Sequence, residues 1–187
     1  MNKQNIAITG LPGTGTTTVA NCLAQKIGYT MISGGTIMRA EAVERGMSIT
    51  ELAKFCEQDF KIDIALDKRQ QALGASTERL ILESRLAWHN MPEGFKILIT
   101  CDRATRIARI AERDGVPYEE AFGMDTERTR ADTDRYYYLY GYTNYLDPCH
   151  YDMAIDSSWQ SVDALVESII EQMEQSGAFP PRLPAHG

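Results

Sequence analysis

Short apolar runs alternate with longer amphipathic segments along most of the chain. The apolar runs predict strands at residues 5–9, 29–33, 79–84, 95–101 and 151–156. Apolar residues that recur every three to four positions predict helices at residues 17–28, 36–45, 48–57, 59–76, 102–113, 118–140 and 161–175. Strands that alternate with helices are typical of an α/β fold, in which helices cover both faces of a parallel sheet. We therefore expect a three-layer α/β/α domain around a five-stranded parallel sheet.

A glycine-rich turn joins the first predicted strand to the first predicted helix. Its glycines and the threonines after them have the spacing of a P-loop, except that Thr16 stands where that motif has lysine. Glycines let consecutive backbone N–H groups form a concave anion site, and the helix N-terminus adds unpaired amides. The hydroxyl of Thr17 is placed to bind Mg²⁺. ATP phosphates are therefore expected at Gly10, Pro12, Gly13, Thr14, Gly15, Thr16, Thr17 and Thr18. The alternative is a glycine-rich turn that binds no ligand.

Other candidate residues follow the second and third predicted strands. Ligands of parallel sheets bind beyond the carboxyl ends of the strands, so these positions should lie near the glycine-rich turn. Glu83 is expected either to orient the waters of Mg²⁺ or to hold Arg85. Arg39 and Arg85 are candidates for binding an acceptor phosphate, and surface ion pairs are the alternative.

Two acidic residues lie one helical turn apart in the segment 59–76. Asp63 and Asp67 have the spacing to accept hydrogen bonds from the amino group of a base, or to orient Arg69. They are equally consistent with exposed residues on a solvated helix.

The basic residues are unevenly distributed along the chain. Every lysine lies at or before Lys96, and the later segments carry arginines instead. A guanidinium forks onto phosphate oxygens and keeps its charge, which suits the transfer of a phosphoryl group. We expect a phosphate-clamping lid that contains Arg109, Arg113, Arg128, Arg130 and Arg135. For Arg103 and Arg106, which share the helical stripe of Arg109, a solvated surface is an equal alternative.

Composition excludes some classes of function. A chain of 187 residues with 43% apolar and 24% charged residues fits one globular domain, and its net charge of −7 argues against a nucleic-acid surface. No apolar run approaches the length of a membrane span, and no signal peptide precedes the turn. The cysteines lack metal-type spacing and are expected to be reduced. We expect a cytoplasmic monomer or weak homodimer that binds small nucleotides but neither nucleic acid nor membranes.

Several sequence blocks, in order, resemble the archaeal-type cytidylate kinases, which are P-loop nucleoside-monophosphate kinases. The resemblance covers most of the chain, from Ile6 to about Glu174. Its blocks are Gly15–Thr18, Ile32–Gly35 with Arg39, Glu44–Ser48, Ile62–Asp63, Asp67–Gln70, Glu83–Ala87, Arg109–Ala111 with Arg113 and Gly115, Glu119–Ala121, Glu127–Arg128, Arg130, Arg135–Tyr136, Tyr140–Gly141 and Ser157–Trp159. In that family a Gly-Thr-Thr-Thr ending is an accepted form of the loop, which implies that arginines supply the missing lysine charge.

The resemblance implies a P-loop NTPase fold and the reaction of ATP with (d)CMP to give ADP and (d)CDP, with Mg²⁺. It divides the single domain into a core (1–33, 76–112 and 136–175), an acceptor insertion (34–75), a lid (113–135) and a tail (176–187). The catalytic residues implied are Arg85, Arg113, Arg128 and Arg130, and Arg109 joins the ATP site. The acceptor would bind Ser33, Gly35, Arg39, Asp63, Arg69, Arg85, Arg130 and Arg135. The metal would bind Thr17 and Glu83.

Departures from the family pattern fall mostly on the acceptor side and leave the identity of the base open. An acidic residue is expected near Thr36, an aromatic residue near Met38, and arginine in place of Lys68. Glu-Gly-Arg-Leu-Ala-Gly-Trp is expected where residues 83–89 read Glu-Ser-Arg-Leu-Ala-Trp-His. One alternative is therefore the same fold acting on another nucleotide or a small phosphorylated metabolite. The other is a nucleotide-binding regulatory protein that has lost turnover together with the lysine.

Overall fold

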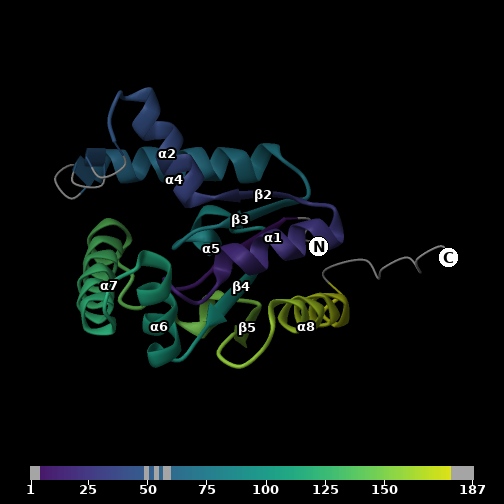
Figure 1. The fold of residues 1–187 in the computed structure, drawn as a ribbon. Coiled ribbons are helices and arrows are strands. Elements are labelled where there is room, and N and C mark those ends of the chain that lie inside the picture. The colour runs from purple at the N-terminus through teal and green to yellow at the C-terminus, as the bar shows by residue number, and fades with distance from the viewer. Residues whose placement is uncertain (1–4, 49–50, 53–54, 57–59, 178–187) are drawn as a thin grey trace.

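The chain folds around a parallel sheet, shown in Figure 1 for a computed structural model that describes residues 5–48, 51–52, 55–56 and 60–177. The sheet has five strands in the order β2-β3-β1-β4-β5, and each neighbouring pair is parallel. The strands are β1 (Ile6–Thr9), β2 (Thr30–Ser33), β3 (Leu80–Glu83), β4 (Phe95–Thr100) and β5 (Met153–Asp156). The strand order and the parallel pairing confirm the predicted fold class.

Helices connect the strands and flank the sheet. They are α1 (Thr16–Ile27), α2 (Gly34–Glu44), α4 (Phe60–Ser76), α5 (Ala87–Asn90), α6 (Arg103–Asp114), α7 (Tyr118–Tyr140) and α8 (Val162–Gln175), with a short 3₁₀ helix at Pro148–His150. In the part of the chain described above, no helix combines the length and apolar character needed to cross a membrane.

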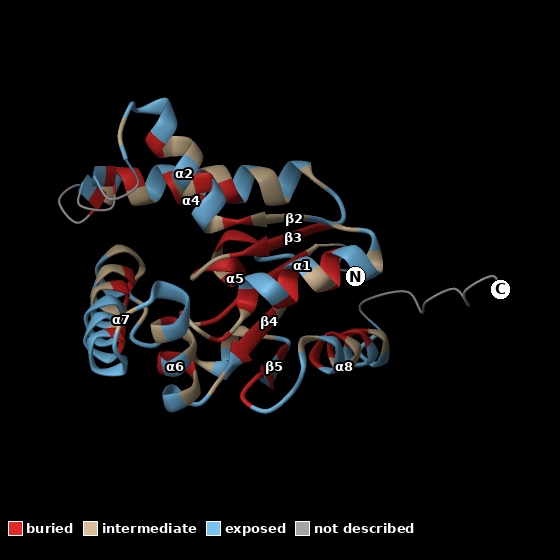
Figure 2. Cartoon of the chain, in the orientation of Figure 1, coloured by how far each residue is buried: buried red, intermediate tan, exposed pale blue. Residues whose placement is uncertain are grey.

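The apolar side chains of alternate strand positions build a core on each face of the sheet (Figure 2). Ile8 and Ile97 pack with Leu23 of α1 and Leu165 of α8 on one face. On the opposite face, the neighbouring strand positions pack against α2, α4 and α5. Because β1, β3 and the middle of β4 are buried on both faces, their sequences are almost continuously apolar.

The predicted elements are largely confirmed, with differences at their ends. The capping box that predicts a helix at 48–57 is present: the Ser48 amide donates to Glu51 Oε2 at 2.8 Å, and the Glu51 amide donates to Ser48 Oγ at 3.2 Å. Parts of that predicted helix lie outside the described residues, as does the tail from residue 178. The short helices α5 and Pro148–His150 are additions that the periodicity does not predict, because one turn is too short to establish a period.

The strand order reverses at β1, which lies between β3 and β4. Ile8 pairs with Glu83 of β3 on one side and with Ile97 of β4 on the other. The register therefore places Glu83 at the carboxyl edge of the sheet, beside the glycine-rich turn. A ligand of such a sheet binds at this edge, next to the reversal.

Two groups of helices flank this edge in Figure 1, α2 with α4 and α6 with α7. Contacts join α4 to α7: Arg135 Nη1 donates to Asp63 Oδ1 at 3.3 Å, and the rings of Phe60 and Tyr138 stack with centroids 5.0 Å apart. The residues expected to form the acceptor insertion and the lid thus belong to these two helical groups. Their division into separate moving parts stays a prediction.

A buried ion pair joins α6 to α7. Arg106 and Asp125 are each 4% exposed, and the guanidinium donates to both carboxylate oxygens at 2.9 and 3.0 Å. Arg106 Nη1 also donates to the carbonyl of Pro12 at 2.6 Å, so the same side chain holds the glycine-rich turn. The prediction that Arg106 belongs to a solvated surface is therefore wrong. Its guanidinium is paired with Asp125 and with the carbonyl of Pro12 inside the protein.

Removing one partner of this pair should destabilise the protein strongly. We expect Asp125→Ala to lower the free energy of unfolding by about 3–5 kcal/mol, because Arg106 would remain buried without its counter-charge. Equilibrium urea unfolding, followed by circular dichroism, measures this change. Asp134→Ala is the control on the same helix, because Asp134 is exposed and its pair with Arg130 is long, at 3.8 Å. This variant should change the free energy of unfolding by less than about 0.5 kcal/mol. Similar losses for both variants would contradict the structural role of the pair.

Candidate active site

The glycine-rich turn wraps over the end of β1 and leads directly into α1. Gly13 and Gly15 have φ values of 80° and 84°, in the left-handed region that favours glycine. Gly15 caps α1 without a side-chain hydrogen bond to the helix. The first amides of α1 are therefore available to an anion, as expected for a phosphate-binding loop.

Side chains from α6 and the end of β5 hold the carbonyl groups of this loop. Arg109 donates from Nη1 to the carbonyl of Gly13 at 3.3 Å and from Nη2 to the carbonyl of Ser157 at 2.9 Å. Ser157 Oγ in turn lies 2.7 Å from the carbonyl of Thr14. With Arg106 on Pro12, three consecutive carbonyl groups of the loop have side-chain donors. These bonds fix the loop before any ligand arrives, which lowers the entropy lost on binding.

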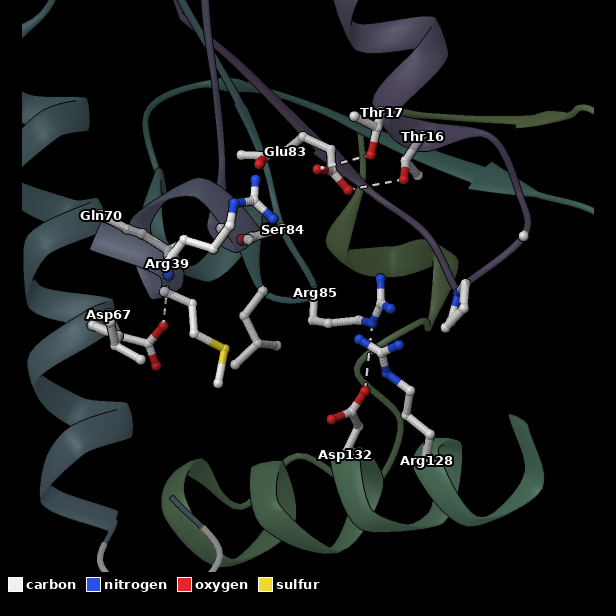
Figure 3. A pocket seen from close by; sticks show the side chains of 18 of the residues that line it. Thr16, Thr17, Arg39, Asp67, Gln70, Glu83, Ser84, Arg85, Arg128 and Asp132 are labelled. Atoms are coloured by element: carbon white, nitrogen blue, oxygen red, sulfur yellow. Dashed lines mark hydrogen bonds and ion pairs between the residues drawn. The ribbon is translucent and has the colours of Figure 1, made fainter. Parts of the chain in front are cut away.

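Glu83 binds the two threonines at the start of α1. Thr16 Oγ1 donates to Glu83 Oε1 at 2.8 Å, and Thr17 Oγ1 lies 3.3 Å from Glu83 Oε2. Thr16, at the position of the P-loop lysine, thus uses its hydroxyl on a buried carboxylate. Figure 3 shows this group at one end of the cleft.

A cleft of about 700 Å³ opens beyond the carboxyl ends of the strands. Most of the residues that the sequence singles out line this cleft, and they come from the turn, the strand ends and the helices α1, α2, α4, α6 and α7. Those that line it are Pro12, Gly13, Gly15, Thr16, Thr17, Thr18, Ser33, Gly35, Arg39, Asp63, Glu83, Arg85, Arg109, Arg113, Arg128 and Arg135. Gly10 and Thr14 lie beneath this surface: the Gly10 carbonyl accepts from Arg85 Nη1 at 2.8 Å, and Thr14 is 1% exposed.

Two predicted arginines are not among the residues that line the cleft. Arg130, on α7, has a side chain that is 77% exposed and lies 3.8 Å from Asp134. Arg69 donates to both carboxylate oxygens of Glu44 at 3.1–3.2 Å, joining α4 to α2. A helix turns by about 100° per residue, so Arg128 and Arg130 cannot share one face of α7.

Two of the arginines that line the cleft near α6 and α7 pair with acidic residues. Arg85 Nε is 3.4 Å from Asp132 Oδ2, and Arg113 donates from Nε to Asp114 Oδ1 at 2.7 Å. Desolvation, followed by the nearby charge of Arg85, lowers the pKa of Arg128. A guanidinium still stays charged at neutral pH, so this crowding concentrates positive charge where phosphates would lie.

The acceptor side of the cleft carries carboxylates and a further arginine. Arg135 Nη1 is 3.3 Å from Asp63 Oδ1, and Arg135 Nη2 is 3.6 Å from Asp132 Oδ1. Burial raises the pKa of Asp63, and the charge of Arg135 opposes that shift. On the neighbouring helix α2, Arg39 Nη2 donates to Thr36 Oγ1 at 3.2 Å.

The cleft is also lined by residues that the sequence does not assign to the site, among them Ser84, Gln70, Asp132 and, beyond its weighing with Asp63, Asp67. The sequence does not distinguish Asp132 or Gln70 as site residues, because each lies among many other charged or polar residues of a helix. Ser84 carried a usable signal, because it departs from the glycine expected after Glu83.

A parallel sheet with a phosphate-binding loop after β1, and a cationic cleft at its carboxyl edge, defines a protein of the P-loop NTPase class. Within that class, the chain belongs to the cytidylate kinase-like family, whose sequence model matches residues 5–159.

Curated archaeal relatives support the same assignment. The chain is 34% identical over 174 residues to a cytidylate kinase of Methanococcoides burtonii, across 93% of this chain and 99% of the relative. It is 40% identical over 171 residues to a cytidylate kinase of Methanosarcina mazei, across 87% of this chain and 94% of the relative. A cytidylate kinase of Pyrococcus furiosus is 36% identical over 177 residues, across 92% and 91% of the two chains.

Solved structures share the fold at low sequence identity. An uncharacterized protein from Eubacterium ventriosum superposes with a TM-score of 0.71 at 19% identity, across 92% of this chain and 99% of that chain. Shikimate kinase from Bacteroides thetaiotaomicron gives a TM-score of 0.66 at 12% identity, across 91% and 98% of the two chains. At these identities the likeness concerns the fold alone.

Two glycines of the loop provide a matched test of its backbone. A Cβ at Gly13 would lie 2.5 Å from the Arg106 carbonyl oxygen, whereas a Cβ at Gly15 would meet no atom within 4 Å. Both have a left-handed φ, so Gly15→Ala should cost about 1–2 kcal/mol of unfolding free energy from backbone strain alone. Gly13→Ala should cost at least about 1 kcal/mol more, because the backbone of α6 must also move. Unfolding of the ligand-free variants compares the two, and equal losses would rule out the close approach of α6.

Proposed function

We propose that the chain transfers the terminal phosphoryl group of ATP to CMP or dCMP, giving ADP and the cytidine diphosphate. The bond from the terminal phosphorus to the bridging oxygen of ATP breaks, and a bond to a phosphate oxygen of the monophosphate forms. The observation that carries the proposal is one cleft of this family member, in which the phosphate-binding loop meets arginines from α2, α6, α7 and the end of β3. The relatives' name, cytidylate kinase, supports cytosine as the base.

The donor side is formed by the loop and the start of α1. Backbone amides of Gly13 to Thr18 would bind the ATP phosphates, and Arg109 would keep the loop in shape through Gly13 and Ser157. Because these groups are already fixed, the phosphates can be held in line for transfer with little reorganisation.

The residues beside the loop fit a magnesium ion. Thr17 Oγ1 and Glu83 Oε2 lie 3.3 Å apart at the end of β3, and both are oxygen donors of the kind that Mg²⁺ prefers. Mg²⁺ characteristically takes few protein ligands and keeps several waters and substrate phosphates, so these two oxygen atoms are enough as its protein ligands. When bound, the ion would neutralise phosphate charge.

Arginines take the place of the missing lysine charge in this proposal. Arg85, Arg113 and Arg128 line the cleft, and as forked donors they would stabilise the charge on the moving phosphoryl group. Arg39 and Arg135, with Ser33 and Gly35, would bind the acceptor. Arg130 joins the site only if the lid closes, and Arg69 only if its pairing with Glu44 is exchanged. Lid closure would exclude the water that otherwise hydrolyses ATP.

The two arginines of α7 separate a cleft residue from a neighbouring surface residue. Arg128→Ala should lower kcat/KM for CMP by about 100-fold or more, because it removes a donor to the developing charge. Arg130→Ala should lower it by less than about 10-fold, since that side chain lies outside the open cleft. Steady-state kinetics with ATP and CMP measure both. A loss for Arg130→Ala as large as that for Arg128→Ala would place Arg130 at the phosphates in the closed state.

Thr16 provides a second test, aimed at the regulatory alternative. The wild type should phosphorylate CMP or dCMP in a coupled assay across the common monophosphates, because Thr16 serves Glu83 and the arginines carry the charge. Thr16→Lys should therefore raise kcat by less than about 10-fold. An inactive wild type that still binds ATP, together with an active Thr16→Lys variant, would instead favour a nucleotide-binding regulatory protein.

A further inference from the structure

Unmet hydrogen-bonding groups gather around the acceptor side of the cleft. Among the described residues, seven buried side-chain atoms lack a hydrogen-bond partner, and four belong to residues that line the cleft. Those four are Asp63 Oδ2, Gln70 Oε1, Ser84 Oγ and Arg85 Nε, of which Arg85 Nε still lies 3.4 Å from Asp132 Oδ2 in an ion pair. Buried polar groups are nearly always paired in folded proteins, so such a cluster indicates a missing ligand. The two that lie on α4 are both acceptors.

Gln70 stands out because its amide has only one possible orientation. Its side chain is buried, at 7% exposure, and Nε2 donates to Asp67 Oδ1 at 3.3 Å. Asp67 also accepts from Asn90 Nδ2 at 2.7 Å and from the Tyr140 hydroxyl at 2.6 Å. A carboxylate can only accept, so the amide nitrogen must face Asp67 and the amide oxygen is left over. Figure 3 shows Gln70 and Asp67 together on the α4 side of the cleft.

The surroundings of Gln70 suit a planar base. Met38, Leu66 and Leu86 line the cleft as apolar walls, while Asp63, Asp67 and Gln70 lie on one face of α4. The oxygen atoms on α4 accept hydrogen bonds, so they favour a base whose edge carries a hydrogen-bond donor. Cytosine has an exocyclic amino group where uracil has a carbonyl oxygen, so uracil would set an acceptor against an acceptor.

We propose that Gln70 determines the base specificity of the acceptor site. Its amide oxygen accepts a hydrogen bond from the exocyclic amino group of cytosine, and Asp67 is the positioning residue that fixes the amide. This assignment rests on the proposed function and names which group reads the base. The oxygen is shielded from water before the base enters, so the new bond replaces none to water and satisfies an unmet acceptor. The unbranched side chain of Met38 is able to move aside as the base enters.

The ratio of kcat/KM for CMP to that for UMP tests the proposal. The wild type should favour CMP, and Gln70→Met, which keeps the length but removes the amide, should lower the ratio by about 10- to 100-fold. Asp67→Ala provides a second variant, which removes the carboxylate that accepts from the Gln70 amide. Without that acceptor, either end of the Gln70 amide can face the cleft. That variant should lower the ratio by about 10-fold.

Gln71→Met is the matched control, on the same helix and outside the residues that line the cleft. It also removes a side-chain hydrogen bond, from Gln71 Nε2 to Asn90 Oδ1 at 3.4 Å, and should leave the ratio within about 2-fold. Equilibrium binding of CMP and UMP gives the same comparison without turnover, and it serves for any variant that folds but is inactive.

The outcomes separate this proposal from the proposed function. A wild type that phosphorylates CMP, with a ratio unchanged in Gln70→Met and Asp67→Ala, overturns the role of Gln70 alone. Equal losses for CMP and UMP in Gln70→Met also overturn it, because they indicate a structural role. A wild type that phosphorylates no monophosphate overturns the proposed function and this assignment with it. If Gln70→Met does not fold, the ratio in Asp67→Ala decides.

Discussion

The site depends on one constraint, the need of a buried guanidinium for full pairing. Arg106 meets that need with Asp125 of α7 and the carbonyl of Pro12, so α6, α7 and the phosphate-binding loop are held by one side chain. An unpaired charge inside a protein costs several kcal/mol, which makes any loosening of this link costly. The loop therefore keeps its shape without a ligand, and α7 presents Arg128 and Arg135 toward the cleft. The rigidity of the donor side follows from electrostatics more than from the glycines themselves.

The loop also shows how a P-loop is completed without its lysine. A lysine at position 16 would bring a positive charge next to Glu83; the threonine brings a hydroxyl that Glu83 accepts at 2.8 Å. The carboxylate thus stays beside Thr17, where a metal would need it. The positive charge that lines the cleft belongs instead to arginines of α2, α6, α7 and the end of β3. In the proposed function, charge neutralisation and acceptor binding are therefore linked in space.

Acidic side chains keep the arginines apart and in place. Asp132 lies between Arg85 and Arg135 at 3.4 and 3.6 Å, and Asp63 adds a second partner for Arg135. Without these carboxylates, guanidinium groups crowded into one cleft would repel each other and move apart. Contacts between α4 and α7, including the bond from Tyr140 to Asp67, then join the base side of the cleft to the phosphate side. These packed contacts connect the two sides of the cleft physically.

Local sequence signals were sufficient for the fold and for the phosphate-binding loop. Alternating apolar runs and helical periodicity gave the five strands, and glycine spacing with Thr17 gave the loop, because these depend on short-range chemistry. The sequence also supplied most of the cleft arginines as a group. It left the role of Arg106 open, because its buried partner Asp125 lies on another helix. It could not separate Arg128 from Arg130, since near neighbours on a helix differ only in the direction they face. Nor could it pair Gln70 with Asp67, or Asp125 with Arg106. Those partners are set by how helices pack across the sheet, and only the tertiary structure brings them within hydrogen-bonding distance.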